Sequence, residues 1–506
     1  MKNKLSLMLS LSLALSATGQ ASKANDTLDV GYERVILTLN PYATTDRLPL
    51  VLAHNWGDTL LVRDPASGKL VPHLATSWKK VNATTLELKL RQGVKFHNGE
   101  NFNADSVVAT FNYAVDPKNP NPGADILRWI DKAEKVNEYT VRLISKKPAP
   151  IALETLSTSA IMLPAKYLKE AGAAGLAKNP VGTGPYRFVS WKANTMTFKA
   201  NDSYFGGAKT KPKISNLVVH MIPEESSRVA ALTTGELSLV RPGGISSDQA
   251  PLLARNSELK IDSADILRFW FLQMDATGRS GVEYFKNPKV RQAVYMAINR
   301  DEIEKVLLGG YAQTIDTPCN PAQFGCDAKA AKTYKYDPVA AKKLLAEAGY
   351  PNGFTVDLYG YREQSVAQAL TGYLAKIGIK ANLKWYGGQY DVASQSLAAG
   401  KVPLWFGSWG ANSVYDASTG MDPFFSRGGE FVYIKDPAVQ NALANAGITI
   451  SSAARAALFK SAIARVTDQA YWVPLFSGKV IAGMRANLNW SPSNDEIDRY
   501  WLASWK

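Results

Sequence analysis

Side chains that can bind a small molecule follow two strand-like segments in the second half of this sequence. Tyr361 and Arg362 come directly after one segment, and Trp409 and Asn412 come shortly after another. In open α/β sheets, ligands lie outside the carboxyl ends of the strands. A guanidinium offers paired hydrogen-bond donors, and an aromatic ring can wall a pocket. These positions therefore predict a binding site, and the residue types indicate capture of a ligand.

No arrangement of residues supports catalysis. The sequence has four histidines, and none is paired at the spacing of a metalloprotease motif. The stretch FGSWG is not the turn that presents a hydrolase nucleophile, because Phe406 replaces its first glycine. There is also no phosphate-binding loop and no Cys-x-x-Cys pair. We therefore expect no catalytic residue, no metal and no cofactor, and keep a secreted hydrolase as a distant alternative.

An alternation of strands and helices is expected to position the strand-end residues. Strand patterns cover 354–359, 379–385 and 402–408, and helical patterns cover 363–377 and 389–399. Gly378 and Gly400 follow the two helices, where glycine commonly ends a helix. The order β-α-β-α-β predicts parallel strands.

Further helices and strands are expected outside this unit. Helical patterns cover 290–308 and 338–348, and another covers 104–115 with Asn103 as its cap. Strand patterns in the first half cover 86–90, 139–143, 195–199 and 217–221. The whole chain therefore reads as mixed α/β.

The first residues have the pattern of a secretory signal peptide. Lys2 and Lys4 precede an apolar run at 5–17, which is shorter than the roughly 20 residues of a membrane-spanning helix. Small residues follow, and cleavage is expected near Ala24. No second run of spanning length follows. We therefore expect residues 1–24 to be removed and the mature chain to act in the periplasm.

Cys319 and Cys326 are the two cysteines of the chain, in a loop that contains proline and glycine. In an exported protein, an even pair at this spacing favours a disulfide. Closing so short a loop would stabilise the fold by about 2.5 kcal/mol in the entropic model. Two free thiols are the alternative, and the lack of a nearby histidine argues against a metal site.

Charge and length restrict the partners and the architecture. The formal charge is +14, and loss of the three lysines in residues 1–24 would leave +11. Because the basic residues are interspersed with acids, we expect a solvated basic surface and no nucleic-acid partner. A mature chain of about 480 residues exceeds the roughly 250–300 residues of one core, which predicts two lobes.

Four segments, in order along the chain, resemble one known family. They are LATSWKKVNATTLELKLRQGVKFHNGENFNADSVVATF (74–111), NPVGTGPYRFVSW (179–191), VRQAVYMAINRDEI (290–303) and YDPVAAKKLLAEAGYPNGF (336–354). The sequence is similar to the family 5 extracellular solute-binding proteins, the dipeptide- and oligopeptide-binding type of ABC importers. The similarity covers nearly the whole mature chain.

The resemblance implies an α/β fold, the two-lobed periplasmic-binding-protein clamp of the cluster C type with an extra N-terminal subdomain. Its expected parts are lobe one at 25–274 with the subdomain at about 62–185, lobe two at 275–477, a return to lobe one at 478–506, and crossings near 271–275 and 474–479. The resemblance also implies a monomer that captures a peptide-like small molecule and delivers it to an ABC permease in the inner membrane.

The resemblance assigns roles to two strand-end residues. Arg362 matches the arginine that grips a peptide carboxylate, and Asn412 stands where the family has an aspartate for the ligand's ammonium group. An amide cannot neutralise an ammonium. Either Asp416 or Asp422 replaces the lost acid, or the ligand is an opine or another amine-blocked carboxylate.

The remaining candidates are aromatic or come from lobe one. Trp405, Trp409 and Tyr361 are expected to wall the pocket, with core packing as the alternative for Trp405. The stretch NPYATTDRL resembles the segment that meets the ligand from the opposite lobe, which makes Thr45 and Asp46 candidates.

Overall fold

The computed structural model describes residues 21–118 and 121–506. The predicted signal peptide, residues 1–24, lies outside these ranges except for its last four residues, which form the short helix α1 (Ala21–Ala24). None of the helices within the described ranges is long and apolar enough to cross a membrane.

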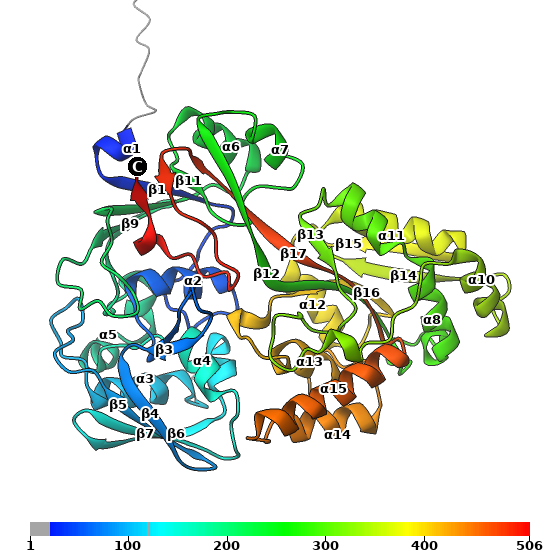
Figure 1. The fold of residues 1–506 in the computed structure, drawn as a ribbon, viewed down its shortest axis with the longest axis horizontal. Coiled ribbons are helices and arrows are strands. Elements are labelled where there is room, and N and C mark those ends of the chain that lie inside the picture. Colours follow the sequence, from blue (N-terminus) through cyan, green and yellow to red (C-terminus); the bar gives the residue numbers. More distant parts are fainter. Residues whose placement is uncertain (1–20, 119–120) are drawn as a thin grey trace, which may run out of the picture.

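Within the described residues, one sheet of eleven strands extends through both halves of the molecule (Figure 1). In order of pairing, its strands are β15 (Ile379–Trp385), β14 (Phe354–Gly360), β16 (Leu404–Trp409), β12 (Leu259–Met274), β17 (Trp472–Arg485), β11 (Leu239–Val240), β1 (Thr27–Tyr32), β10 (Asn216–Met221), β9 (Thr195–Ala200) and β8 (Tyr186–Lys192), with β13 (Ala312–Thr314) paired to β17. The half that contains β1 and β8–β11 is lobe one, and the half that contains β14–β16 is lobe two. The expected two-lobed α/β architecture is therefore confirmed.

Two long antiparallel strands, β12 and β17, connect the lobes and run side by side across the middle of Figure 1. At its lobe-two end β12 also pairs with β16, and at its lobe-one end β17 pairs with β11. The register of the β12–β17 pair shifts between Asp265 and Phe269. An irregularity of this kind bends a strand, so the connection can change direction between the lobes.

Lobe two contains the parallel unit that the sequence predicts. β14 pairs in parallel with both β15 and β16. Helix α11 (Gln364–Lys376) follows β14, and α12 (Tyr390–Ala398) follows β15. Val366, Leu370 and Leu374 are buried on one face of α11, because residues four apart share a helix face. The carboxyl ends of β14 and β16 therefore meet at one edge of the sheet.

The helix predicted over 290–308 is interrupted, so this prediction was wrong in its extent. Helix α8 (Pro288–Ala297) ends at Ile298, whose backbone is extended, and α9 (Arg300–Glu302) starts a second segment that continues as a π-helical turn to Leu307. Asn299 separates them, because its side chain accepts a hydrogen bond from the backbone N–H of Glu302. An asparagine that caps a new helix ends the preceding one.

Lobe one carries a smaller antiparallel sheet. Its strands, in order, are β4 (Ala75–Asn82), β5 (Thr85–Leu90), β7 (Thr140–Ser145) and β6 (Ile130–Asn137). Helix α3 (Ala104–Ala114) packs on β6 and β7 and buries Val107 and Phe111. The predicted cap is confirmed, since the backbone N–H groups of Asp105 and Ser106 donate to Asn103.

The chain after β17 returns to lobe one and ends near β1 (Figure 1). Strand β18 (Leu488–Asn489) pairs with β19 (Ser504–Trp505), and Tyr500 and Trp501 are buried in the lobe-one core. The other elements of lobe one are α2 (Arg47–Trp56), β2 (Leu61–Arg63), β3 (Leu70–Pro72), α4 (Ala152–Thr158), α5 (Ala165–Lys178), α6 (Glu225–Thr234) and α7 (Ala250–Leu253). The other helices of lobe two are α10 (Pro338–Glu347), α13 (Ser418–Phe425), α14 (Pro437–Ala446) and α15 (Ser452–Asp468).

Candidate functional site

A cavity of about 660 Å³ lies between the lobes, beside the crossing strands. Its wall includes Glu33 and Arg47 of lobe one, Arg268 of β12, Arg362 of lobe two and Glu496 of the C-terminal return. Ligand pockets for small molecules typically measure about 300–1,000 Å³. The cavity therefore has the size of a small-molecule site, and both lobes contribute to it.

Strand β12 presents alternate side chains to the cavity, as a strand must. Ile266, Arg268 and Trp270 line it. The Trp270 ring stacks on Phe476 of β17, with 5.0 Å between ring centroids, and both rings belong to the wall. A side chain at Gly478 of β17 would collide with the Trp270 ring. The glycine therefore allows an apolar surface to form where the two crossing strands meet.

Arg268 is the charged residue of this strand face. Its guanidinium Nε lies 3.8 Å from a carboxylate oxygen of Glu496, and its side chain is 18% exposed. Burial lowers the pKa of Arg268, and the neighbouring guanidinium groups of Arg362 and Arg47 lower it further, whereas Glu496 raises it. An arginine nevertheless stays protonated in a protein. Any side chain at Gly410 would collide with the Arg268 guanidinium, so this glycine makes room for it.

Arg362 and Glu363 follow β14 and line the cavity. Within the described part of the chain, the Arg362 side chain has no ion pair and no hydrogen bond. Glu363 has a left-handed backbone with φ of 55°. Glu363 is exposed at the cavity. Partial removal of its carboxyl group from water raises its pKa, and the positive charge of Arg362 opposes this rise. Left-handed residues other than glycine are costly and cluster at functional sites.

Arg47 brings a third guanidinium from the first turn of α2. Its Nη2 donates to the Ser413 hydroxyl of lobe two, and its Nη1 is buried without a hydrogen-bond partner among the described residues. The predicted neighbours Thr45 and Asp46 do not line the cavity. Asp46 instead caps α2 and pairs with Arg34 at 3.0 Å. The segment expected to meet the ligand therefore contributes Arg47, the residue that follows them.

The loop after β16 forms a contact between the lobes. Ala411, Asn412 and Ser413 are consecutive residues with φ of 48°, 51° and 61°. The Ser413 hydroxyl donates to the backbone carbonyl of Asp495 and accepts from Arg47. A left-handed backbone costs about 1–2 kcal/mol for most residues, and less for asparagine. Asn412 itself is partly buried and does not line the cavity.

Asp416, an acid that the sequence offers for the ligand's ammonium group, does not line the cavity. It is 3% exposed, and both of its carboxylate oxygens bind the Arg455 guanidinium. The alternative acid, Asp422, accepts a hydrogen bond from the Ser426 hydroxyl and also lies outside the cavity wall. Neither aspartate is therefore placed to face a ligand ammonium group.

The predicted aromatic residues pack beneath the strand ends and do not line the cavity. Tyr361 and Trp405 stack at 5.6 Å between ring centroids and are almost fully buried. Trp409 packs edge-on against Phe424, and its indole donates to the backbone carbonyl of Thr419 at 2.6 Å. Tyr361 and Trp405 belong to the core of lobe two, and Trp409 is partly buried against it. Among the predicted contact residues, Arg362 is thus the one in the cavity wall.

The sequence did not predict most charged residues of the cavity wall, among them Arg47, Arg268 and Glu496. Arg268 had a signal, since it is the one charged residue in the apolar strand sequence ILRFWFLQM. Glu496 had none. It sits in a loop held by the ion pair between Asp495 and Arg499, with a left-handed backbone at φ 58°.

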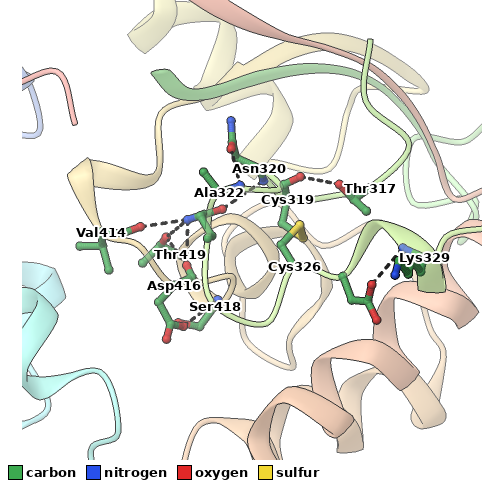
Figure 2. The surroundings of a disulfide bond; sticks show 12 residues. Thr317, Cys319, Asn320, Ala322, Cys326, Lys329, Val414, Asp416, Ser418 and Thr419 are labelled. Carbon is green, nitrogen blue, oxygen red and sulfur yellow. Dashed lines mark hydrogen bonds between the residues drawn. A yellow bond between two sulfur atoms is a disulfide. The ribbon is translucent and has the colours of Figure 1, made fainter. Parts of the chain in front are cut away.

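The predicted disulfide is confirmed, since Cys319 is joined to Cys326 (Figure 2). The loop between them lies beside residues 414–419. The side-chain amide of Gln323 donates to the carbonyl groups of Val414 and Asp416 at 3.0 and 2.9 Å. The disulfide loop thus supports the segment that follows the left-handed turn.

Two α/β lobes joined by crossing strands, with a charged cavity between them, define a periplasmic-type solute-binding protein. The model of the bacterial extracellular solute-binding proteins, family 5 Middle, matches residues 69–431. The chain belongs to this family, as its sequence motifs indicated.

Individual relatives agree with this assignment. A glutathione-binding protein of Pectobacterium atrosepticum is 31% identical over 461 residues, which cover 88% of this chain and 87% of that protein. The periplasmic binding protein DppA of Helicobacter pylori, in complex with the peptide STSA, has a TM-score of 0.81 at 26% identity and covers 95% of this chain and 98% of its own. A dipeptide-binding protein of Pseudoalteromonas sp. SM9913, in complex with Met-Leu, has the same fold, with a TM-score of 0.81 at 23% identity and coverage of 95% and 100%.

Proposed function

We propose that this protein is the substrate-binding component of an ABC importer, and that it captures a peptide or peptide-like small molecule in the inter-lobe cavity. The observation that carries the proposal is the Arg362 guanidinium, which lies in the cavity wall at the carboxyl end of β14 and has no ion pair or hydrogen bond with the described residues. The family and the names of the relatives support it. The protein performs no chemistry on its ligand.

Capture works through the two lobes. Arg362 of lobe two binds a ligand carboxylate through two parallel hydrogen bonds. Arg47 and Glu496 reach the cavity from lobe one and the C-terminal return, and the rings of Trp270 and Phe476 contact apolar parts of the ligand. A ligand that touches both lobes favours the arrangement in which they are close together. A permease in the inner membrane then receives the loaded protein.

Glu496 is the acid that we propose for the ligand's ammonium group. Asn412 and Asp416 do not line the cavity, whereas Glu496 does, and its Oε2 is buried without a hydrogen-bond partner in the described residues. A buried carboxylate oxygen without a partner is costly, and an ammonium group would satisfy it. This arrangement favours a ligand with a free amine over an opine or another amine-blocked carboxylate.

The same proposal places the protein in the periplasm as a monomer. It requires residues 1–24 to direct export and to be removed. Mass spectrometry of the protein from a periplasmic extract tests this, because cleavage after Ala24 leaves a chain that begins at Asn25. A chain that keeps its first residues in the cytoplasm would contradict the export.

The function is tested by calorimetric titration of protein that has been unfolded, freed of ligand and refolded. The probes are glutathione, an unmodified dipeptide, the N-acetylated dipeptide and the dipeptide amide. We expect the free peptides to bind, the N-acetylated form to bind more weakly because it lacks the partner of Glu496, and the amide to bind more weakly because it lacks the partner of Arg362. Binding of none of them would overturn the proposal. Recovery of cleaved peptide would establish the hydrolase instead.

A further inference from the structure

The arginines of the cavity wall fall into two groups. Three of the six are engaged within lobe one. Arg34 pairs with Asp46, Arg228 donates to backbone carbonyls at 2.6–3.1 Å, and Arg241 lies 2.8 Å from Glu33 and 3.0 Å from Asp498. The other three are Arg47, Arg268 and Arg362. No acid in the described residues lies within 3.5 Å of any of these three guanidinium groups.

All three guanidinium groups line the same cavity, and Arg268 lies near the other two. The charges of Arg362 and Arg47 both act on Arg268, and Glu496, at 3.8 Å, is the acid that opposes them there. Glu363 adds a second negative charge beside Arg362. These three arginines and two glutamates leave an excess of one positive charge; Arg362 and Glu363 are exposed, whereas Arg47, Arg268 and Glu496 are partly buried, where charges interact more strongly. An anion bound between the arginines would attract each of them and offset the repulsion of Arg268 by the other two.

The three arginines come from three separate elements on both sides of the cavity. Arg47 lies on α2, Arg268 on β12, and Arg362 after β14. One terminal carboxylate needs one guanidinium for a paired contact, and Arg362 already supplies it. Arg47 and Arg268 then remain for another acidic group, and Nη1 of Arg47 is buried without a partner in the described chain.

We propose that the ligand carries two carboxylates, one bound by Arg362 and the second held between Arg47 and Arg268. This inference rests on the proposed function and narrows it to acidic peptide-like molecules. A ligand with two carboxylates and one ammonium group has a net charge of −1, which balances the excess of +1 that these three arginines and two glutamates leave. Because Arg47 and Arg268 come from different elements, the second carboxylate also draws the start of α2 toward β12.

The test compares ligands that differ by one carboxylate. Alanyl-glutamate and alanyl-glutamine have the same size and the same terminal groups. Glutamyl-alanine and glutaminyl-alanine form a second such pair, with the acidic or amide residue in the first position. We expect the acidic member of at least one pair to bind about 10–100-fold more tightly, the effect of a charged hydrogen-bond pair. Arg47→Gln and Arg268→Gln should each reduce this preference to less than about threefold. The control Arg427→Gln, at an exposed lobe-two arginine outside the cavity wall, should retain it.

The outcomes separate this inference from the function on which it rests. Equal binding of the acidic and amide members of both pairs would overturn the second carboxylate and leave peptide capture intact. Binding of no peptide at all would overturn both. A variant that loses affinity for acidic and amide peptides equally would assign its arginine to general peptide binding or to folding, which contradicts the inference. Two variants are used so that failure of one to fold leaves the other to decide.

Discussion

Arg362 combines three properties at the residue scale. It lies at the carboxyl end of β14, it lines the cavity, and its guanidinium has no protein partner among the described residues. Arg362 is exposed, so water can satisfy its guanidinium when no ligand is bound. Because no acid among the described residues binds this guanidinium, it is available to a carboxylate that arrives from solution.

Replacing Arg362 tests this directly. Arg362→Ala should weaken the binding of a free dipeptide by about 1.5–3 kcal/mol, the range for a charged hydrogen bond. Arg427→Ala should leave the affinity unchanged, because Arg427 donates to Asn441 on the surface of lobe two. Titration calorimetry of both variants measures the difference. Wild-type affinity in Arg362→Ala would exclude this arginine from the site.

Asp422 makes a pH-dependent contribution to stability. Burial raises the pKa of its carboxyl to about 6, Ser426 and Arg455 oppose the rise, and the nearby Asp416 adds to it. The folded state therefore holds a proton that the unfolded state has already lost, so stability falls as the pH rises from about 4 to about 6. Asp422→Asn removes this charge. We compare the free energy of unfolding of the variant with that of the wild type. This difference should be about 2 kcal/mol more favourable to the variant at pH 7.5 than at pH 4, after allowance for partial exposure.

Urea unfolding of both proteins at pH 4, 5, 6 and 7.5 measures this gain. The comparison cancels the titration of all other groups, because the two proteins share them. An asparagine at position 422 can still accept the hydrogen bond from Ser426. A stability difference that does not change with pH would show that Asp422 has an ordinary pKa.

Some residues of the cavity wall could be predicted from the sequence and others could not, for a physical reason. Arg362 follows a strand whose neighbours in the sheet are also its neighbours along the chain, so local order was enough. Arg268 faces the cavity because β12 pairs with β16, over 130 residues away, and local patterns do not encode that pairing. Glu496 lies in the C-terminal segment that returns to lobe one, and local patterns do not predict that this segment borders the cavity. The aromatic candidates lie at the predicted edge of the sheet, but Tyr361 and Trp405 are buried in the core and Trp409 packs against it.

At the element scale, a short disulfide loop supports a segment that follows a left-handed turn. The loop contacts that segment through Gln323 and through Phe324, whose backbone N–H donates to the Tyr415 carbonyl at 3.0 Å. Arg455 holds the same segment from α15 by binding Asp416. A covalent link and a buried ion pair thus fix a backbone that, at Ala411 and Ser413, is intrinsically unfavourable.

Removing the disulfide should lower the stability of the protein. Cys319 and Cys326 are buried in an apolar cluster, so the double variant Cys319→Ala and Cys326→Ala leaves no unsatisfied polar group. We expect a loss of about 2–3 kcal/mol and a lower melting temperature by calorimetry. A reductant should shift the wild type by a similar amount and leave the double variant unchanged. An equal effect of reductant on both proteins would contradict a role for this disulfide.

Elements whose signals are local were predicted well, and the one misjudged helix shows where local signals compete. The parallel unit of lobe two has helical periodicity, glycine ends and short connections that all agree. The stretch 290–308 is apolar on one face throughout, yet Asn299 prefers to cap a new helix. Apolar periodicity alone does not report such a break.

On the scale of the whole molecule, the lobes also touch outside the cavity. The Arg63 guanidinium of lobe one lies 4.2 Å from the centre of the Tyr415 ring of lobe two. The backbone N–H of Tyr415 donates to Glu154, which also pairs with Arg63. None of these three residues lines the cavity. The lobes therefore have a contact that can stabilise their approach without touching ligand.

Because this contact joins the lobes without lining the cavity, we expect its removal to change affinity through lobe closure. Tyr415→Ala removes the cation–π contact, worth about 0.5–1 kcal/mol at a partly exposed site. Because affinity scales with the fraction of protein in the binding-competent state, the variant should bind dipeptide about 2–5-fold more weakly. Small-angle X-ray scattering of the refolded, ligand-free variant should give a larger radius of gyration than the wild type, and saturating ligand should remove the difference.

The matched control is Tyr336→Ala, at a lobe-two tyrosine that is 39% exposed and outside the cavity wall. It should keep wild-type affinity and scattering. Weaker binding by Tyr415→Ala with unchanged scattering in both states would place the effect in the cavity and not in closure. Unchanged affinity would mean that ligand alone, through Arg362 and the residues opposite it, supplies the free energy that brings the lobes together. Either result would decide whether the contact between Arg63 and Tyr415 belongs to the binding equilibrium of the molecule.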